Sequence, residues 1–256
     1  MNQLREHLQQ LSHKPLQEVS ENFDHIELTD EEIELAMRQA REQKHYLLKR
    51  QEYNDKINED LKPPKFTAEQ MIEAYAEEFI VDDDNREVVA QLAYYFATDP
   101  RFTGSFNRGL FLYGPVGVGK TELMRFFQRN QKQSFRLYTC RAVETGYSKK
   151  GDEGIGAFYT QQTMNAADIF GHRQIGYCFD DLGTEPVTTN FYGTAKAVMA
   201  EVILNRYDAK IPFVMTHVTS NLTAEQIRHR YGDRAADRMR EMFNFIAFDG
   251  GKSRRA

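Results

Sequence analysis

The chain has 256 residues, enough for one large domain or for a core of ordinary size with a smaller appendage. Its net charge of −5 and pI of about 5.9 argue against wholesale coating of nucleic acid, although a local basic surface could hold a single strand. With no apolar leader and no run of eighteen apolar residues, we expect a cytoplasmic protein without a signal peptide or membrane span. Cys140 and Cys178 lack C-x-x-C spacing and are expected to be buried thiols.

Residues 1–65 are charged and poor in glycine. Apolar residues recur at helical spacing in the first segment and predict a short amphipathic helix: Leu4, Leu8 and Leu11. Thr29 with Glu32 has the pattern of a capping box and opens a long charged helix toward Leu61, which the following prolines end. Its apolar stripe is too narrow to bury it alone, so it needs a partner: its own core, a second copy or another protein.

Two further helices lead into an α/β core. Thr67 with Gln70 is a second capping box, and another helix is expected from about Asn85 to Phe96. From Leu110 onward, apolar runs with β character alternate with helical runs, which is typical of a parallel sheet covered by helices. The expected strands are 109–113, 135–140, 174–179, 211–218 and 244–248. We therefore predict a helical partner-binding region over 1–65 and a core domain over 66–256.

The first of these strands runs into the pattern G-x-x-x-x-G-K-T. The loop residues are Gly114, Pro115, Val116, Gly117, Val118, Gly119, Lys120 and Thr121, followed by Glu122. Glycine lets such a loop turn so that backbone N–H groups converge on a phosphate, and the helix that follows points its positive end at the anion. Lys120 would add charge for the β- and γ-phosphates, and Thr121 a hydroxyl for Mg²⁺. A plain glycine-rich turn is the alternative, but the pattern arises by chance in only about one such chain in a hundred.

Paired acids end a later apolar strand, as in a Walker B pattern. Asp180 is expected to hold Mg²⁺, and Asp181 to polarise the attacking water; the alternative is an ordinary acidic turn. The second acid is Asp rather than the Glu of many such ATPases. Asn221 ends another apolar strand, where its amide could orient the water, although it could also be an N-cap for the helix starting near Thr223.

Five segments occur in one order: GPVGVGKT, FDDLG, TSNLT, GDRAADRMRE and GGKSRR. Together they resemble the DnaC/IstB-type ATPases, helicase loaders and transposition ATPases of the AAA+ initiator clade, over about residues 85–256. The resemblance implies an α/β P-loop NTPase core of the AAA+ type, with a parallel five-stranded sheet in the order 5-1-4-3-2. It also implies ATP and Mg²⁺ at the loop and assembly into homo-oligomeric arcs or spirals. The chain ends too soon for the C-terminal helical lid of most AAA+ proteins, so no lid is expected.

The same resemblance assigns roles to single residues. Asn221 matches the first sensor, and Arg238 matches the arginine finger that reaches a neighbour's γ-phosphate. Arg254 matches the second sensor, which touches the nucleotide of its own subunit. A planar cation suits charge that grows on phosphate oxygens. The alternatives are a surface pairing of Arg238 with Asp237 or Glu241 and a plain tail position for Arg254.

The sequence therefore predicts an ATPase, slow and stimulated by assembly or DNA, that loads a replicative helicase onto single-stranded DNA. Residues 1–65 would grip the helicase. The alternatives are a transposition accessory ATPase that binds duplex DNA and a non-catalytic adaptor that ATP only stabilises. A mixture of cations and aromatic residues could bind the single strand by stacking, although the same segment also reads as polar loop plus helix: Tyr147, Lys149, Lys150, Phe158, Tyr159 and Arg173.

Overall fold

The computed structural model describes residues 29–60 and 63–248, in a chain that divides into the units Met1–Lys62 and Pro63–Ala256. The described part of the first unit is a single helix, α2 (Asp30–Asp60). Its start confirms the predicted capping box, because Thr29 N donates to Glu32 Oε2 at 2.8 Å and Glu32 N donates to Thr29 Oγ1 at 3.4 Å. The helix predicted around Leu4, Leu8 and Leu11 lies outside the described residues.

The second unit begins with two helices that the sequence predicted. Helix α3 (Ala68–Glu78) has the expected capping box between Thr67 and Gln70, and α4 (Arg86–Ala97) follows it. Both pack through buried apolar side chains, among them Tyr75 of α3 and Leu92 of α4. Among the described residues, no helix is long and apolar enough to cross a membrane.

A parallel sheet forms the centre of this unit. Its five main strands are β1 (Gly109–Tyr113), β2 (Phe135–Thr139), β4 (Gln174–Leu182), β7 (Thr216–Ser220) and β8 (Phe243–Ala247). They lie in the order β2-β4-β7-β1-β8, and each neighbouring pair is parallel. Numbered one to five along the chain and read from the β8 edge, this order is 5-1-4-3-2, which confirms the predicted fold class. A short strand, β3 (Gln162–Thr163), pairs antiparallel with β4.

One predicted strand begins later than expected, and one hairpin was not predicted. Residues 211–218 were expected to be extended, but Phe213–Met215 form a 3₁₀ turn, η1, and β7 starts at Thr216. Pro212 has a φ of −50°, and its carbonyl accepts a hydrogen bond from Met215 N at 2.9 Å, which closes the turn before the strand. The hairpin pairs β5 (Thr189–Phe191) with β6 (Thr194–Lys196) in a separate two-stranded sheet.

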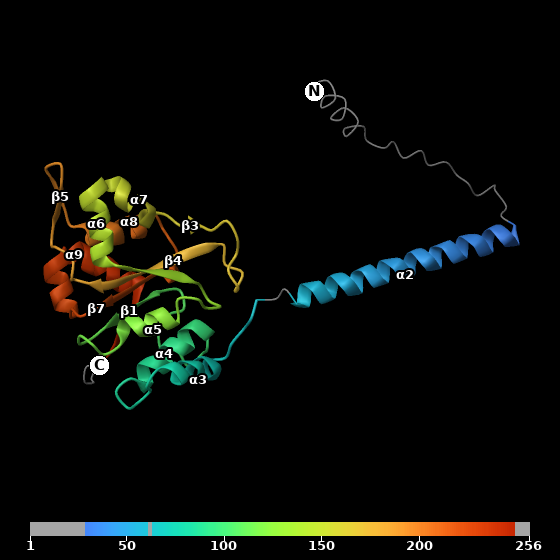
Figure 1. Cartoon of the computed structure of the whole chain (residues 1–256), viewed down its shortest axis with the longest axis horizontal. Coiled ribbons are helices and arrows are strands. Elements are labelled where there is room, and N and C mark those ends of the chain that lie inside the picture. The colour runs from blue at the N-terminus through green and yellow to red at the C-terminus, as the bar shows by residue number, and fades with distance from the viewer. Residues whose placement is uncertain (1–28, 61–62, 249–256) are drawn as a thin grey trace, which may run out of the picture. The chain divides into compact units, whose positions relative to one another are not determined.

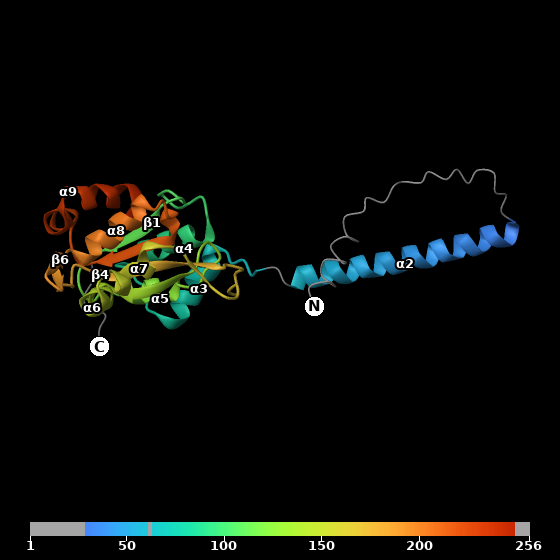
Figure 2. The same cartoon turned by 90° about the horizontal axis from the view of Figure 1, so that it is seen from above.

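Helices cover both faces of the sheet, so β1 is buried on both sides. Leu110 and Leu112 pack with α3, α4 and α5 (Lys120–Phe126), whereas Phe111 packs on the opposite face. The helices of that face are α6 (Cys140–Lys150), α7 (Asp152–Tyr159), α8 (Val198–Asp208) and α9 (Ala224–Met242). Figure 1 shows the second unit with α3, α4 and α5 gathered on one side, and Figure 2 shows α8 and α9 across the sheet from α3 and α5. This layering leaves the carboxyl ends of β1, β4 and β7 side by side.

Candidate functional site

The glycine-rich loop joins β1 to α5, and its backbone uses conformations that favour glycine. The φ angles of Gly114, Gly117 and Gly119 are +150°, +88° and +100°. A Cβ on Gly114 would lie 2.5 Å from the carbonyl oxygen of Phe248, so the loop also passes too close to the chain after β8 for any larger residue. Val118 is buried, and its side chain packs into the hydrophobic core beneath the loop, together with residues of α3, α4 and α5. The backbone therefore has the turns that the predicted phosphate loop requires.

The other loop positions differ in their exposure. Val116 is 58% exposed and Pro115 is also exposed, so the loop has an open side. Glu122, predicted to contact the nucleotide, is exposed in the first turn of α5 and forms an ion pair with Arg125 at 3.4 Å. An exposed pair of this kind contributes little to stability.

Lys120 is the buried cation of the site. Its ammonium donates hydrogen bonds to the carbonyl oxygens of Gly114 at 2.9 Å and Pro115 at 2.7 Å, and to Oδ1 of Asn221 at 2.7 Å. The residue is 5% exposed. The structure thus brings together two predicted site residues, Lys120 at the start of α5 and Asn221 directly after β7.

The predicted metal ligands also meet. The hydroxyl of Thr121 lies 2.9 Å and 3.1 Å from the two carboxylate oxygens of Asp180, and Thr219 donates to Asp180 Oδ1 at 2.6 Å. Burial raises the pKa of Asp180 above its usual range, and the two hydroxyl donors partly offset this effect. Hydroxyl and carboxylate oxygens are ligands that suit Mg²⁺, which usually takes few protein ligands and completes its shell with phosphate and water. The pair fits the ion, and the described residues hold no larger group of metal-binding side chains.

Asp181 occupies an unusual backbone position directly after Asp180. Its φ is +56°, in the left-handed region, and the pairing of β4 with β7 shifts register between Phe179 and Leu182. Asp181 N donates to the hydroxyl of Thr219 at 2.9 Å. A bulge of this kind re-aims a side chain, so the second acid takes a direction that a regular strand would not give it.

Thr219 is a site residue that sequence reasoning missed. It is fully buried in β7, and its hydroxyl bridges the carboxylate of Asp180 and the backbone of Asp181. One signal was available, because Thr219 lies two residues before Asn221 on the same apolar strand. A hydroxyl on a strand buried along its whole length needs partners nearby.

Arg238 lies on α9, where it contacts two acidic residues of the same helix and a tyrosine of α8. Its Nη1 lies 3.2 Å from Glu241 and 3.5 Å from Asp237, the pairing described above as the alternative. Its guanidinium carbon also lies 4.5 Å from the centre of the Tyr207 ring. The structure therefore does not bring Arg238 together with the phosphate loop of its own chain. Arg254 lies outside the described residues, as does any lid after β8.

The aromatic residues of the predicted stacking site for single-stranded DNA differ in their exposure. Tyr147 is buried, and Phe158 packs edge to face against Tyr138 and Tyr177, with ring centres 5.2 Å apart in both pairs. The hydroxyl of Tyr159 is buried as well. Tyr147 therefore belongs to the core, whereas Phe158 and Tyr159 are half-buried and pack against it. Binding of a single strand at this segment stays a prediction. Exposed cations remain on this segment: Lys149, Lys150 and Arg173.

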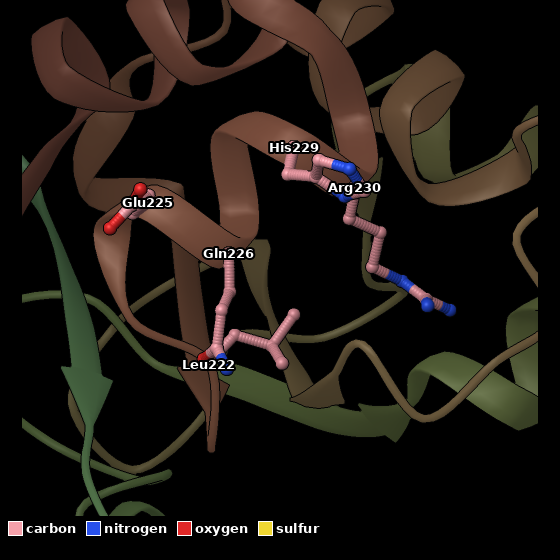
Figure 3. Close-up of a pocket in the computed structure, with 5 residues that line it drawn as sticks. All are labelled: Leu222, Glu225, Gln226, His229 and Arg230. Atoms are coloured by element: carbon pink, nitrogen blue, oxygen red, sulfur yellow. The ribbon is translucent and has the colours of Figure 1, made fainter.

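A pocket of about 380 Å³ lies where the chain leaves β7 and enters α9. Its lining residues are Leu222, Glu225, Gln226, His229 and Arg230. Figure 3 shows the guanidinium of Arg230 pointing away from Glu225. In that direction Arg230 donates to the backbone carbonyl of Glu185, so the pocket adjoins the segment that follows the paired acids.

No family model and no curated protein matches the sequence. The structure is similar to a solved DNA replication initiation factor, with a TM-score of 0.45 and 16% identity, covering 73% of this chain and 50% of that one. It is also similar to AMPPCP-bound DnaA from Aquifex aeolicus, with a TM-score of 0.41 and 17% identity, covering 72% of this chain and 50% of that one. The matched part thus spans half the length of each of these proteins. Similarity at this level does not identify a function.

Proposed function

We propose that the chain binds ATP with Mg²⁺ at residues 114–121 and hydrolyses it while loading a replicative helicase onto single-stranded DNA. One observation carries the nucleotide site: Lys120 contacts Asn221 and the adjacent Thr121 contacts Asp180, which joins three separate segments at the carboxyl edge of the sheet. A buried cation, an acid–hydroxyl pair and an amide beside a glycine-rich loop suit a triphosphate.

Each residue of the site has a separate role in the proposed hydrolysis of ATP. The loop N–H groups and Lys120 would bind the β- and γ-phosphates, and Thr121 and Asp180 would hold Mg²⁺, which would neutralise phosphate charge when bound. Asp181 and Asn221 orient the attacking water in line with the bond that breaks. Arg238 of a neighbouring copy stabilises the charge that grows on the γ-phosphate. Turnover then requires assembly of several copies.

Helix α2 is the proposed binding element for the helicase. It carries six large hydrophobic side chains that are each at least 41% exposed: Ile33, Leu35, Met37, Tyr46, Leu47 and Leu48. Apolar side chains presented on a long charged helix favour burial against a groove of another protein. The alternative to this proposal is the pairing of α2 with a second copy of the chain.

The proposal is tested by co-purification with the replicative helicase of the same source, with and without ATP. The full chain should capture the helicase, and a chain lacking residues 1–65 should not. A full-length Met37→Glu/Leu47→Glu variant should also lose capture, whereas Arg41→Glu, an exposed polar position on the same helix, serves as the matched control. Failure of the full chain to capture the helicase would contradict helicase loading. It would leave the proposed nucleotide site unaffected.

Two other functions keep the same fold. A transposition accessory ATPase would bind duplex DNA more strongly than single strands, with a steep dependence on salt. A non-catalytic adaptor would bind ATP without turnover. ATP hydrolysis that DNA stimulates and that Asp181→Asn abolishes would exclude the adaptor.

A further inference from the structure

Glu185 is a buried carboxylate shortly after the paired acids. The residue is 3% exposed, and its Oε2 accepts a hydrogen bond from Gly183 N at 2.9 Å. Its Oε1 accepts a hydrogen bond from the hydroxyl of Tyr231 and lies 3.9 Å from Nε of Arg230. Arg230 also donates to the backbone carbonyl of Glu185. A carboxylate with so little water around it is stable only because these partners replace its hydration.

The turn between Asp181 and Glu185 sets the position of Asp181. Thr184 donates to the carbonyl oxygen of Asp181 through both its backbone N, at 3.1 Å, and its hydroxyl, at 2.8 Å. Gly183 has a φ of +105°, and a Cβ there would lie 2.5 Å from Leu222 Cδ1. The bond from Gly183 N to Glu185 closes this turn. A displacement of Glu185 is therefore transmitted to the backbone that carries Asp181.

The partners of Glu185 lie at a break in α9. Arg230 and Tyr231 immediately precede Gly232, whose φ of +84° and ψ of +165° interrupt the helix. Arg238 lies in the part of α9 beyond the break. Burial and the charge of Glu185 raise the pKa of Tyr231, so its phenol stays protonated and remains a donor at neutral pH. Hydrogen bonds from Arg230 and Tyr231 to Glu185 thus connect the first part of α9 to the turn after β4.

We propose that Glu185 is a positioning residue that couples α9 to Asp181. Tyr231 and Arg230 hold Glu185, and Glu185 holds the turn that places Asp181 for the attacking water. Nucleotide binding relies on Lys120, whose ammonium donates to Gly114 O and Asn221 Oδ1, so we expect the coupling to act on turnover rather than on affinity. A shift of α9 when a neighbouring copy binds would change hydrolysis through this contact. The inference rests on the proposed ATPase activity.

The test uses Tyr231→Phe in the full chain, since this change removes only the hydroxyl, which donates to Glu185 and accepts from Arg230 Nε at 3.3 Å. The kcat for ATP should fall roughly tenfold, as expected for loss of a hydrogen bond to a charged group, while KM stays within about twofold. Glu185→Gln should show the same split. The matched control is Tyr95→Phe, which removes another buried tyrosine hydroxyl, bonded to the Arg108 carbonyl at 2.6 Å, outside the site. Its kcat should stay at the wild-type value.

The outcomes separate the inference from the function on which it rests. A lower kcat at unchanged KM in both site variants, with Tm values shifted no more than in the control, supports the coupling. Wild-type kcat in Tyr231→Phe and Glu185→Gln overturns it and leaves the ATPase proposal standing. A loss of kcat that only follows a loss of Tm also overturns it, because the network is then purely structural. A wild-type chain without ATP turnover overturns both.

Discussion

The ammonium of Lys120 donates to Oδ1 of Asn221 at 2.7 Å, across a separation of 101 residues in the sequence. The same ammonium donates to the carbonyl oxygens of Gly114 and Pro115. Phosphate binding therefore exchanges bonds within the protein for bonds to the ligand. Under the proposed function, we therefore expect the affinity for ATP to depend on how strongly Asn221 holds Lys120.

Substitutions at Asn221 should separate binding from turnover. Asn221→Asp replaces a neutral acceptor with a charged one, which holds Lys120 more strongly and should raise the Kd for ATP roughly tenfold. Asn221→Ala removes the acceptor, so ATP should bind at least as tightly as to the wild type while turnover falls. A fluorescent-ATP titration and a phosphate-release assay measure the two effects. Equal affinities for the Asp and Ala variants would contradict this account of the contact.

Removal of the buried cation should abolish nucleotide binding. Lys120→Ala leaves the loop without its charge for the β- and γ-phosphates, and a fluorescent-ATP titration should detect no saturable binding. Lys65→Ala, at an exposed lysine outside the site, is the control for loss of one positive charge. An unchanged affinity of Lys120→Ala for ATP would contradict the assignment of the phosphate loop.

Substitution of Arg238, the proposed arginine finger, should affect turnover but not binding. Arg238→Ala should bind ATP like the wild type and lose turnover under assembling conditions by roughly a thousandfold. Arg234→Ala is a matched control on the same helix, since Arg234 is exposed and lies 3.5 Å from Asp208. If Arg238→Ala hydrolyses ATP at the wild-type rate per subunit, the finger lies elsewhere.

His217 should make the fold sensitive to acid. It is fully buried and accepts a hydrogen bond from Leu110 N at 3.1 Å, and burial lowers its pKa from 6.5 to about 3. Below pH 6.5 the unfolded chain binds a proton there that the folded chain does not, so stability falls with falling pH down to about pH 3. The loss is about 1.4 kcal/mol per pH unit.

A comparison with His217→Asn isolates this effect from that of the carboxylates. Asparagine keeps an acceptor for Leu110 N but does not titrate. Urea unfolding between pH 7 and pH 4 should show the free energy of unfolding of the wild type falling more steeply than that of the variant. Parallel curves would mean that His217 is protonated in the folded chain as well.

Local signals in the sequence predicted much of the fold. The capping boxes at Thr29 and Thr67 form as expected, and β1 has the predicted bounds of 109–113. These features depend on residues close together in the chain or on alternation within one strand. The resemblance to a known family gave the strand order, which no local pattern contains.

The sequence did not predict contacts that depend on packing between distant segments. Glu185 meets Tyr231 across 46 residues, and neither belongs to a recognised motif. Tyr147 was considered for base stacking because cations flank it, yet tertiary packing buries it beneath the β5–β6 hairpin residue Phe191, with ring centres 6.0 Å apart. Strands as short as those of this hairpin fall below the length at which alternation is informative.

The central claim, that this site hydrolyses ATP, is tested most directly by phosphate release from the wild type and from Asp181→Asn, with and without single-stranded DNA. The substitution keeps the size of the side chain and removes the charge that orients water. We predict turnover in the wild type that rises with DNA and is lost in Asp181→Asn, while both bind ATP. Equal phosphate release by the two proteins, or none from the wild type, would contradict the account.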